Sequence, residues 1–438
     1  MTTKNNIPVG YKDSAVGIIP QEWEVKPFKN LGTFLRTNTL SREHMNNVEG
    51  LALNIHYGDV LVRYGEILDC SKTAIPWVNN SCRETRLGDR LQNGDIVISD
   101  TAEDYTVGKA TEVCNVGNNC VLSGLHTMAF RPPKETFALR YLGYYFNSPA
   151  YRAQLYSLIQ GIKVCSISKS AISNTYIPVP PMEEQRKIAE ILGVWDEAIE
   201  KQSRLIERLE VRKRALMQRL LTGRIRLSGF TTPWQKIKLG EAGIFLSTNT
   251  LSREKLNDND GYIQNIHYGD ILVKYSSIVD AQLTAIPYIN NGVDISSDYL
   301  ENGDIVFSDT AEDSIVGKAI EISNIADNKI VAGLHTMLFR PNKGCYAQYF
   351  LGYYINSDAY RKQLAPLIQG IKVCSISKKA ISQTVLETPS LSEQKAIAEV
   401  LTAADNEIAT HRKKLDALRL QKRGLMQQLL TGKTRVKI

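Results

Sequence analysis

An internal repeat is the feature of this chain that most constrains its fold. Five stretches of sequence occur twice, 211 residues apart at first and 209 residues apart later. The shared stretches are TNTLSRE (37–43 and 248–254), NIHYGD (54–59 and 265–270), NGDIVISDTAED (93–104 and 302–313, with Ile98 replaced by Phe307), GLHTM (124–128 and 333–337) and QGIKVCSISK (160–169 and 369–378). A repeat this long exceeds the roughly 20 to 50 residues of solenoids and propellers, so each copy is expected to fold by itself. Two similar domains on one chain suit a target with two similar halves.

The composition is that of a globular protein. The 438 residues are 43% hydrophobic and 23% charged, and each copy is large enough to bury a core. The polar start MTTKNNIPVGYKDS lacks the apolar run of a secretory signal, and no stretch has the apolar length of a membrane span, so we expect a cytoplasmic protein without membrane contact. The net charge of +7 is compatible with nucleic-acid binding but argues for it only weakly.

The cysteines do not indicate a disulfide framework or a zinc ribbon. They number seven, and they form no C-x-x-C pair. Cys165 and Cys374 occupy the same place in the two copies, and we expect both to be small buried apolar residues.

Each copy is predicted to be strand-rich with one internal helical stretch. The runs DVLVRY at Asp59, DIVIS at Asp95 and TMAFRP at Thr127 have the β-branched and aromatic composition of strands, and turn residues separate them. Residues 141–160 place apolar side chains at helical spacing. The expected fold class is therefore α+β, with the same arrangement in the second copy.

A long helix is predicted after each copy. Beyond the proline segments at 177–181 and 387–390, the chain is rich in Glu, Lys and Arg and carries apolar residues at alternating spacings of four and three, which is a heptad seam. The predicted helix-pair seam includes Ile188, Leu192, Ile199, Leu209, Leu216, Ile397, Leu401, Ile408, Leu418 and Leu425. Two seam positions are polar in both copies, Gln202 with His411 and Lys213 with Lys422, which favours a fixed register over maximal stability.

The order of segments predicts an antiparallel helix pair. Each helix would be about 58 Å long at 1.5 Å per residue. A second helix that follows a compact domain can return alongside the first only in the antiparallel sense, which would relate the copies by a pseudo-twofold axis. The predicted segments are domain 1 (1–181), the first long helix (182–226), domain 2 (227–390) and the second long helix (391–438).

This order of segments resembles the specificity subunits of Type I restriction-modification enzymes. The motifs that carry the resemblance are the opening GYKDSAVGIIPQEWEVKPF, the junction IPVPPMEEQRKIAEIL, the helix end LLTG, and the second junction TPSLSEQKAIAEVL. The likeness covers essentially the whole chain. It implies two target recognition domains that each bind one half of a bipartite duplex DNA site, with helices that fix the spacing. It also implies two modification (methyltransferase) subunits and restriction/translocase subunits as partners, which would carry S-adenosylmethionine, ATP and Mg, and a role in defence against foreign DNA.

The repeat adds an expectation of its own. Domains related by a twofold axis match inverted half-sites, and near-identical domains favour half-sites of the same or nearly the same sequence. We therefore expect a palindromic or near-palindromic target. The copies differ most at residues 77–92 against 288–301, so the half-sites would differ if that segment touches bases.

The DNA-contacting residues are sought in shared segments that are too polar for a core, because Arg, Lys, Asn, Ser and Thr side chains match the groove edges of base pairs. The candidates are Asn38, Arg42, His56, Tyr57, Lys163, Ser166 and Lys169, with Asn249, Arg253, His267, Tyr268, Lys372, Ser375 and Lys378 in the second copy. The structural alternative is that Asn38 and Ser41 cap a turn or helix and that residues 57–59 are only a tight turn.

Catalysis is not expected in this chain. It has no glycine-rich S-adenosylmethionine turn, no N-P-P-Y or D-P-P-Y motif and no ATP-binding loop. The shared histidines 56, 126, 267 and 335 and the acids 100, 103, 104, 309, 312 and 313 lack metal-ligand or nuclease spacing, so no metal site is predicted. The alternatives left open are a coiled-coil adaptor that binds only proteins and, with less support, a free-standing DNA-modifying enzyme.

Overall fold

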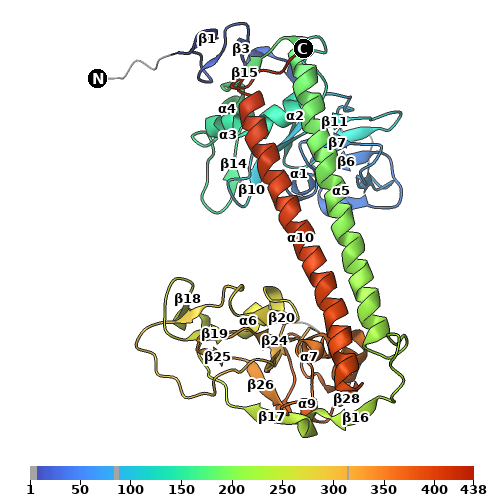
Figure 1. The fold of residues 1–438 in the computed structure, drawn as a ribbon. Coiled ribbons are helices and arrows are strands. Elements are labelled where there is room, and N and C mark those ends of the chain that lie inside the picture. The colour runs from blue at the N-terminus through green and yellow to red at the C-terminus, as the bar shows by residue number, and fades with distance from the viewer. Residues whose placement is uncertain (1–6, 83–87, 313–314) are drawn as a thin grey trace. The chain divides into compact units, whose positions relative to one another are not determined.

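The computed structural model describes residues 7–82, 88–312 and 315–438, and these form two compact units. Unit 1 comprises Met1–Gln202 with Lys414–Ile438, and unit 2 comprises Ser203–Lys413. Each unit therefore contains one strand-rich domain together with part of helix α5 (Met182–Leu220) and part of helix α10 (Leu391–Leu429). Figure 1 shows both helices as uninterrupted elements, and each has 39 residues. The predicted α+β class, with tandem domains and two long helices that pack together, is confirmed.

Two sheets build the domain of unit 1. A five-stranded sheet has the order β4-β13-β9-β11-β7, in which β11 and β7 are parallel and the other neighbours antiparallel. A four-stranded sheet has the order β12-β6-β8-β5. The strands are β4 (Thr33–Phe34), β5 (Met45–Asn46), β6 (Leu53–Ile55), β7 (Ile67–Asp69), β8 (Trp77–Val78), β9 (Ile96–Ser99), β11 (Ala110–Cys114), β12 (Val121–Ser123) and β13 (Thr127–Arg131).

Three two-stranded ladders and several short helices complete unit 1. The ladders pair β1 (Tyr11–Lys12) with β2 (Ile19–Pro20), β3 (Glu24–Pro27) with β15 (Tyr176–Val179), and β10 (Thr101–Ala102) with β14 (Cys165–Ser166). The helices are η1 (Phe28–Asn30), η2 (Arg42–His44), α1 (Tyr57–Val62), α2 (Tyr141–Phe146), α3 (Pro149–Leu155) and α4 (Lys169–Ser173).

The five-stranded sheet is buried on both faces. Successive side chains of a strand point to opposite faces, and along β9 Ile96 and Ile98 join one apolar core while Val97 joins another. The first core also contains Ile188 and Leu192 of α5 and residues near the end of α10. The domain thus uses both long helices to cover one face of its sheet. Cys165 and Cys374 are buried, as predicted.

Unit 2 repeats the two sheets, the β3–β15 and β10–β14 ladders and the helices α1–α4, whereas the β1–β2 ladder has no counterpart among its described residues. Its sheets have the orders β17-β26-β22-β24-β20 and β18-β21-β19-β25, and β16 pairs with β28 and β23 with β27. The strands are β16 (Gln235–Lys238), β17 (Gly243–Leu246), β18 (Leu256–Asn257), β19 (Gln264–Ile266), β20 (Ile278–Asp280), β21 (Tyr288–Ile289), β22 (Ile305–Ser308), β23 (Thr310–Ala311), β24 (Ala319–Ser323), β25 (Ile330–Ala332), β26 (Thr336–Pro341), β27 (Cys374–Ser375) and β28 (Val385–Thr388). The shorter helices are η4 (Leu239–Glu241), η5 (Arg253–Lys255), α6 (Tyr268–Val273), α7 (Phe350–Ile355), α8 (Asp358–Leu364), η6 (Ala365–Leu367) and α9 (Lys378–Ser382).

Two local predictions are wrong. The run DVLVRY, predicted as a strand, lies in helix α1, because the His56 side chain caps the helix by accepting a hydrogen bond from the Gly58 N–H. The single helical stretch over residues 141–160 is two helices, α2 and α3. Ser148 separates them by capping α3 through the Tyr151 N–H, and Pro149 occupies the first turn of α3.

The two long helices run antiparallel within each unit. In unit 1, Lys422 of α10 pairs with Asp196 of α5, while Arg435, beyond the end of α10, pairs with Glu184 near the start of α5. The residue numbers of the two partners therefore change in opposite directions. The corresponding pairs in unit 2 are Lys213 with Asp405 and Arg226 with Glu393, and Arg412 also pairs with Glu210.

The seam residues divide between two kinds of contact. Ile188 and Leu192 pack into the core of unit 1, and Ile397 and Leu401 pack into the core of unit 2. Leu209 and Ile408 are buried away from those cores, whereas Ile199, Leu216, Leu418 and Leu425 are half-buried. Each helix therefore begins against its own domain. Among the described residues, no helix has an apolar stretch long enough to cross a membrane.

Candidate nucleic-acid interface

Three rings form an aromatic cluster in unit 1: the neighbouring His56 and Tyr57, and His126 from a distant part of the sequence. The ring centroids of His56 and Tyr57 are 4.6 Å apart, and those of Tyr57 and His126 are 5.3 Å apart in an edge-to-face arrangement. Tyr57 begins α1, and His126 lies in the turn between β12 and β13. The cluster is only partly exposed, because 46% of the His126 side chain is accessible whereas His56 is buried and only 7% exposed.

His56 is held in its neutral form. Its Nδ1 accepts the Gly58 N–H at 3.2 Å, so a proton on that nitrogen would remove the helix cap. Burial, followed by the charge of Arg42, lowers the pKa of His56 below its ordinary value. The remaining ring nitrogen, Nε2, therefore carries the proton.

Arg42 lies beside the aromatic cluster on η2. Its Nη1 donates to Asp59 Oδ2 at 2.9 Å, and the Asp59 side chain is 2% exposed. Half of the Arg42 side chain is exposed, so the guanidinium is oriented by a buried carboxylate while N–H groups stay available. Arg63 donates to the other oxygen of Asp59 at 3.2 Å.

His126 is positioned by polar groups of the segment that precedes β10. Its Nδ1 lies 3.4 Å from Asp100 Oδ1 and 3.3 Å from Thr101 Oγ1. The backbone of His126 has a φ of +52°, a left-handed conformation that is uncommon for a residue with a side chain. Such conformations cost free energy and collect at functional sites, so this turn is a candidate for function.

The QGIKVCSISK segment joins the same surface through a short ladder. Thr101 is the partner of Ser166 in the pairing of β10 with β14, and the Ile167 N–H donates to the Asp100 carbonyl at 2.9 Å. Ser166 and Lys163 are both exposed. Four shared segments that are remote in the sequence therefore converge: TNTLSRE, NIHYGD, SDTAED and QGIKVCSISK, together with the turn at His126.

Unit 2 builds the same surface with the same geometry. The His267–Tyr268 and Tyr268–His335 centroids are again 4.6 Å and 5.3 Å apart, and His335 Nδ1 is again 3.4 Å from Asp309 Oδ1. The φ of His335 is +54°. Arg253 differs slightly, because it makes two hydrogen bonds to Asp270, at 2.7 Å and 2.8 Å. Lys372 and Ser375 occupy the positions of Lys163 and Ser166.

Two pairs of predicted DNA-contact residues, Asn38 with Asn249 and Lys169 with Lys378, lie apart from this surface. Asn38 is 3% exposed, and its amide donates to Asn54 Oδ1 at 2.7 Å, while its own oxygen accepts the Leu40 N–H. It therefore stabilises a turn, which was the structural alternative. Lys169 lies at the start of α4 with its ammonium 5.4 Å from the centre of the Phe34 ring. Their counterparts behave alike: Asn249 donates to Asn265, and Lys378 donates to the Leu246 carbonyl.

Sequence reasoning did not select His126, Asp100 or Thr101 as contact residues. The available signal was that four of the six histidines, His56 with His267 and His126 with His335, occupy matching places in the two copies. The acid Asp313, paired in the sequence with Asp104, lies outside the described residues. Within the described ranges, no group of three or more His, Cys, Asp or Glu side chains could hold a metal ion.

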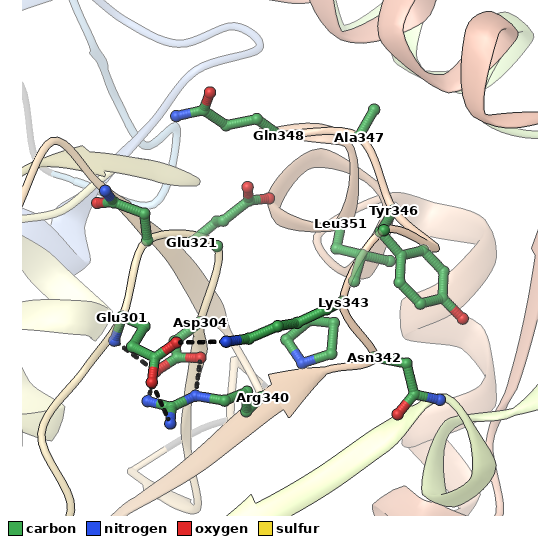
Figure 2. Close-up of a pocket in the computed structure, with 14 residues that line it drawn as sticks. Glu301, Asp304, Glu321, Arg340, Asn342, Lys343, Tyr346, Ala347, Gln348 and Leu351 are labelled. Carbon is green, nitrogen blue, oxygen red and sulfur yellow. Dashed lines mark hydrogen bonds and ion pairs between the residues drawn. The ribbon is translucent and has the colours of Figure 1, made fainter.

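A second polar region, the pocket beside β26, satisfies its own charges. In unit 2 this pocket has a volume of about 360 Å³, and Figure 2 shows Glu301 and Asp304 turned towards Arg340. Arg340 makes ion pairs with Asp304 at 2.7 Å and with Glu301 at 2.8 Å. Glu321 accepts the backbone N–H groups of Tyr349 and Gly352 at the start of α7, and burial raises its pKa to about 7. The charges of Arg340, Asp304 and Glu301 therefore stabilise the domain by pairing with one another.

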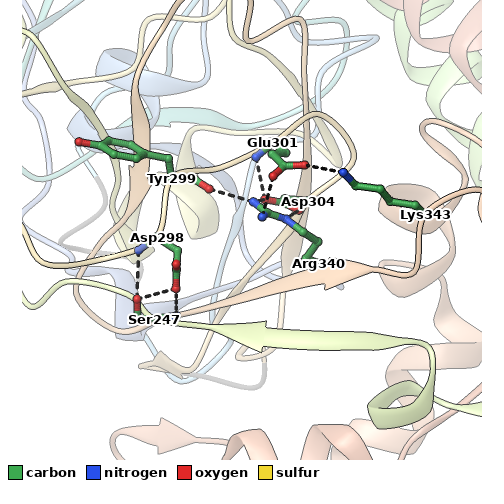
Figure 3. A network of polar contacts seen from close by, with 7 residues as sticks. All are labelled: Ser247, Asp298, Tyr299, Glu301, Asp304, Arg340 and Lys343. Atoms are coloured by element: carbon green, nitrogen blue, oxygen red, sulfur yellow. Dashed lines mark hydrogen bonds and ion pairs between the residues drawn. The ribbon is translucent and has the colours of Figure 1, made fainter.

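The segment in which the copies differ is fixed at both ends beside the TNTLSRE segment. In unit 2, the Asn290 side-chain oxygen accepts a hydrogen bond from Asn257 at 2.9 Å, and its amide donates to the Glu254 carbonyl at 3.1 Å. At the other end, Asp298 accepts both the backbone N–H and the hydroxyl of Ser247, as Figure 3 shows. In unit 1 the same anchors are made by Asn79 with Asn46 and by Arg36 with Asp89. The segment between them has nine residues in unit 1 (80–88) and seven in unit 2 (291–297).

Comparisons with known proteins agree with this architecture. A family model for the Type I restriction modification DNA specificity domain matches residues 20–211 and again residues 232–420. A putative type I restriction enzyme MjaX specificity subunit from Methanocaldococcus jannaschii is 26% identical, over 98% of this chain and 97% of the relative. The MjaVIII specificity subunit from the same organism is 28% identical over 65% of this chain and 68% of the relative. A chain solved in work on complex assembly and conformational transition of the type I R-M system has a TM-score of 0.59 at 16% identity, covering 95% of this chain and 99% of that one.

The chain is thus a DNA-recognition component built from two copies of one domain, and the matched residues cover most of its length. It belongs to the Type I restriction modification DNA specificity domain family. Within a Type I restriction-modification enzyme it is the specificity subunit, the part that does not catalyse.

Proposed function

We propose that this subunit binds a bipartite duplex DNA site, with one half-site on each target recognition domain. The domains would be residues 1–181 and 227–390, and the contact surface in each would contain the aromatic cluster, the neighbouring arginine and the exposed QGIKVCSISK segment. The observation that carries the proposal is that this partly exposed polar surface, assembled from remote segments, recurs in both units with the same ring distances.

The chemistry of the surface fits duplex DNA. Arginine and lysine bind phosphates and guanine edges, and hydroxyl groups bind either. Arg42 and Arg253 are each oriented by a buried aspartate, so little side-chain freedom is lost on binding. Because both surfaces carry the same groups, the two half-sites are expected to be the same or nearly the same sequence in inverted orientation.

The partners follow from the family. Two modification subunits would bind the long helices and supply S-adenosylmethionine, and restriction subunits would supply ATP hydrolysis with Mg. The length of α5 and α10 would then set the distance between half-sites, since about one turn of DNA, roughly 34 Å, brings both halves to the same side of the duplex.

Methylome sequencing tests the proposal. Cells that carry this protein and its cognate modification subunit should show methylated adenine on both strands of a bipartite motif with inverted arms. Absence of any such methylation would count against DNA targeting. Binding of the assembled complex to a motif-containing duplex should also fall steeply with salt, because phosphate contacts release counterions, whereas an adaptor that binds only proteins would show no such dependence.

Alanine replacement of Arg42 tests the surface itself. We expect Arg42→Ala to weaken binding by about 1–3 kcal/mol, and only through the half-site contacted by unit 1. Arg63→Ala is the matched control, because it removes the other arginine partner of Asp59. If the two variants lose the same binding free energy, Arg42 would contribute only by stabilising Asp59 and not by contacting DNA.

A further inference from the structure

The exposed tip of the QGIKVCSISK segment is an apolar feature that the fold does not use. We define the tip segment as residues 161–164 in unit 1 and 370–373 in unit 2. Ile162 is 96% exposed and Ile371 is 97% exposed, and the valines two residues later are 59% exposed in both units. An isoleucine fully in water contributes nothing to a core, so packing does not explain its presence.

Sequence drift between the copies does not explain the tip either. Exposed positions on both sides of it have changed, since Tyr156 is replaced by Ala365 and Tyr176 by Val385. The ten residues that contain the tip segment are identical. Something other than the folding of the domain has therefore kept these exposed side chains.

The tip segment is held in one conformation. Gln160 and Ser166 exchange two backbone hydrogen bonds at 2.9 Å and 2.8 Å, and the same pair closes the segment in unit 2. Gly161 has a φ of +99°, and a Cβ on it would lie 2.0 Å from the Val164 carbonyl oxygen. Cys165, directly after the tip, is buried. A side chain presented on such a closed hairpin loses little conformational entropy when it binds a partner.

The neighbours of the tip segment identify the partner. Lys163 lies between the two apolar residues and is exposed, and Ser166 pairs with Thr101, next to the aromatic cluster. The tip thus continues the surface proposed above for DNA. A two-stranded β-ribbon fits the major groove, and the apolar group that the major groove offers is the C5-methyl of thymine.

We infer that each tip segment enters the major groove of its half-site, where Ile162 or Ile371 contacts a thymine methyl and the adjacent lysine contacts a phosphate. This inference rests on the proposed function. It assigns the apolar part of sequence recognition to a residue pair distinct from the polar groups of the cluster.

Uracil substitution provides the test. The full chain, assembled with its modification subunits, is titrated with duplexes in which each thymine of the two half-sites is replaced in turn by uracil, which lacks only the methyl group. For the unsubstituted protein we expect one position in each half-site to weaken binding about fourfold, equal to about 0.8 kcal/mol for one buried carbon group. The Ile162→Ser variant should lose this sensitivity in the unit 1 half-site and keep it in the other, and Ile371→Ser should do the reverse.

Val62 supplies the matched control, because it is 84% exposed, apolar and shared with Val273 in unit 2. The Val62→Ser variant should keep the uracil sensitivity of both half-sites. The inference is overturned if uracil weakens binding at no position. It is equally overturned if uracil weakens binding of the isoleucine variants as much as binding of the unsubstituted protein. It is also overturned if Ile162→Ser acts by releasing a modification subunit, which would make the tip a protein contact. Failure of the unsubstituted complex to distinguish the motif from unrelated DNA would instead refute the proposed function.

Discussion

Units 1 and 2 carry the same domain but secure the start of its long helix differently. In unit 1, the buried Glu184 accepts the Trp23 indole N–H at 2.9 Å and two N–H groups of Arg435. Arg435 also pairs with Glu22 at 3.0 Å. Figure 1 shows the C-terminal end of the chain close to β3 and β15. The basic tail after α10 is therefore part of the unit 1 structure at Arg435.

Unit 2 has the equivalent ion pair at the start of its long helix, but its described residues do not make the equivalent tryptophan hydrogen bond. Glu393 accepts two hydrogen bonds from Arg226, at 2.7 Å and 2.6 Å. The indole nitrogen of Trp234 is buried and has no hydrogen-bond partner among the described residues. A buried donor without a partner costs about 1–3 kcal/mol, so this junction is less stable than that of unit 1.

Lys422 and Lys213, the lysines at the polar seam positions, also have more partners in unit 1 than in unit 2. Lys422 in unit 1 is 7% exposed and pairs with both Asp196 and Glu66. Lys213 in unit 2 pairs with Asp405, while Ser277 stands where unit 1 has Glu66. In both units a tyrosine hydroxyl, of Tyr144 or Tyr353, donates to the aspartate. A buried lysine in unit 1 and a half-buried one in unit 2 thus occupy seam positions that apolar residues could fill, which favours a role in fixing helix register.

The largest effect is expected from exchanging the one segment whose length differs. In both units the ends of this segment are anchored beside TNTLSRE, close to the proposed DNA surface. We therefore expect a near-palindromic motif whose two arms differ only at the positions that this segment recognises. Replacing residues 80–88 by the sequence of 291–297 should then make the two methylated arms identical. Methylome sequencing of cells with the chimera measures this. Arms that stay as they are in the unmodified protein would show that the segment does not contact bases.

Removing the arginine that pairs with the glutamate at the start of each long helix should destabilise the two units by different amounts. Arg226→Ala leaves the buried Glu393 without its arginine, so we expect a clear loss of stability at this junction. Arg435→Ala should cost less, because Glu184 keeps the Trp23 N–H. Hydrogen exchange of β16 and β28 in one variant, and of β3 and β15 in the other, measures each junction locally. Equal losses, or a larger loss for Arg435→Ala, would contradict the comparison.

Methionine at the seam lysines tests the second contrast. Lys422→Met leaves two carboxylates facing each other in unit 1, whereas Lys213→Met leaves one in unit 2, so the first should be more destabilising. The expected difference is about 1 kcal/mol, which is typical for one buried charge-assisted contact. Adding Glu66→Ser to Lys422→Met should remove the difference. Chemical denaturation monitored by hydrogen exchange in α2 and α7 measures the destabilisation of each unit. If Glu66→Ser leaves the difference between the units unchanged, repulsion between Glu66 and Asp196 is not its cause.

Much of the fold followed from the sequence because the repeat and the heptad spacing are strong patterns. The predicted first long helix covers residues 182–226, and the observed α5 covers Met182–Leu220, so the prediction extends beyond the end of the helix. The run DVLVRY failed because its composition favours a strand, while a single capping contact from His56 and the pairing of Asp59 with Arg42 make it a helix. The Arg42–Asp59 pair joins residues 17 positions apart, and local composition cannot reveal such a contact.

The candidate surface was predictable only in part. Arg42, Tyr57 and Ser166 were selected because they are polar and shared, and these same criteria also selected Asn38, which is buried. Polarity cannot distinguish an amide that contacts solvent from one that completes a turn. Likewise, nothing in the sequence places His126 against Tyr57, since the register of β12 and β13 determines where that turn lies.

The smallest effect should be the same in both units and depends on pH. Because the pKa of His56 is lowered below 6.5, the unfolded segment binds more protons than the folded one just below that pH. The cap on α1 therefore stabilises fully above pH 6.5, and this stabilisation is lost as the pH falls below it. His267 has the same environment, so α6 should respond equally. In His56→Asn and His267→Asn, asparagine still caps the helix but does not titrate. Hydrogen exchange of α1 and α6 at pH 7.5 and 5.5 should show a loss of up to about 1 kcal/mol in the unsubstituted protein, the usual worth of a cap, and none in the variants. An effect confined to one unit would mean that the two aromatic clusters, despite their equal distances, are not equivalent.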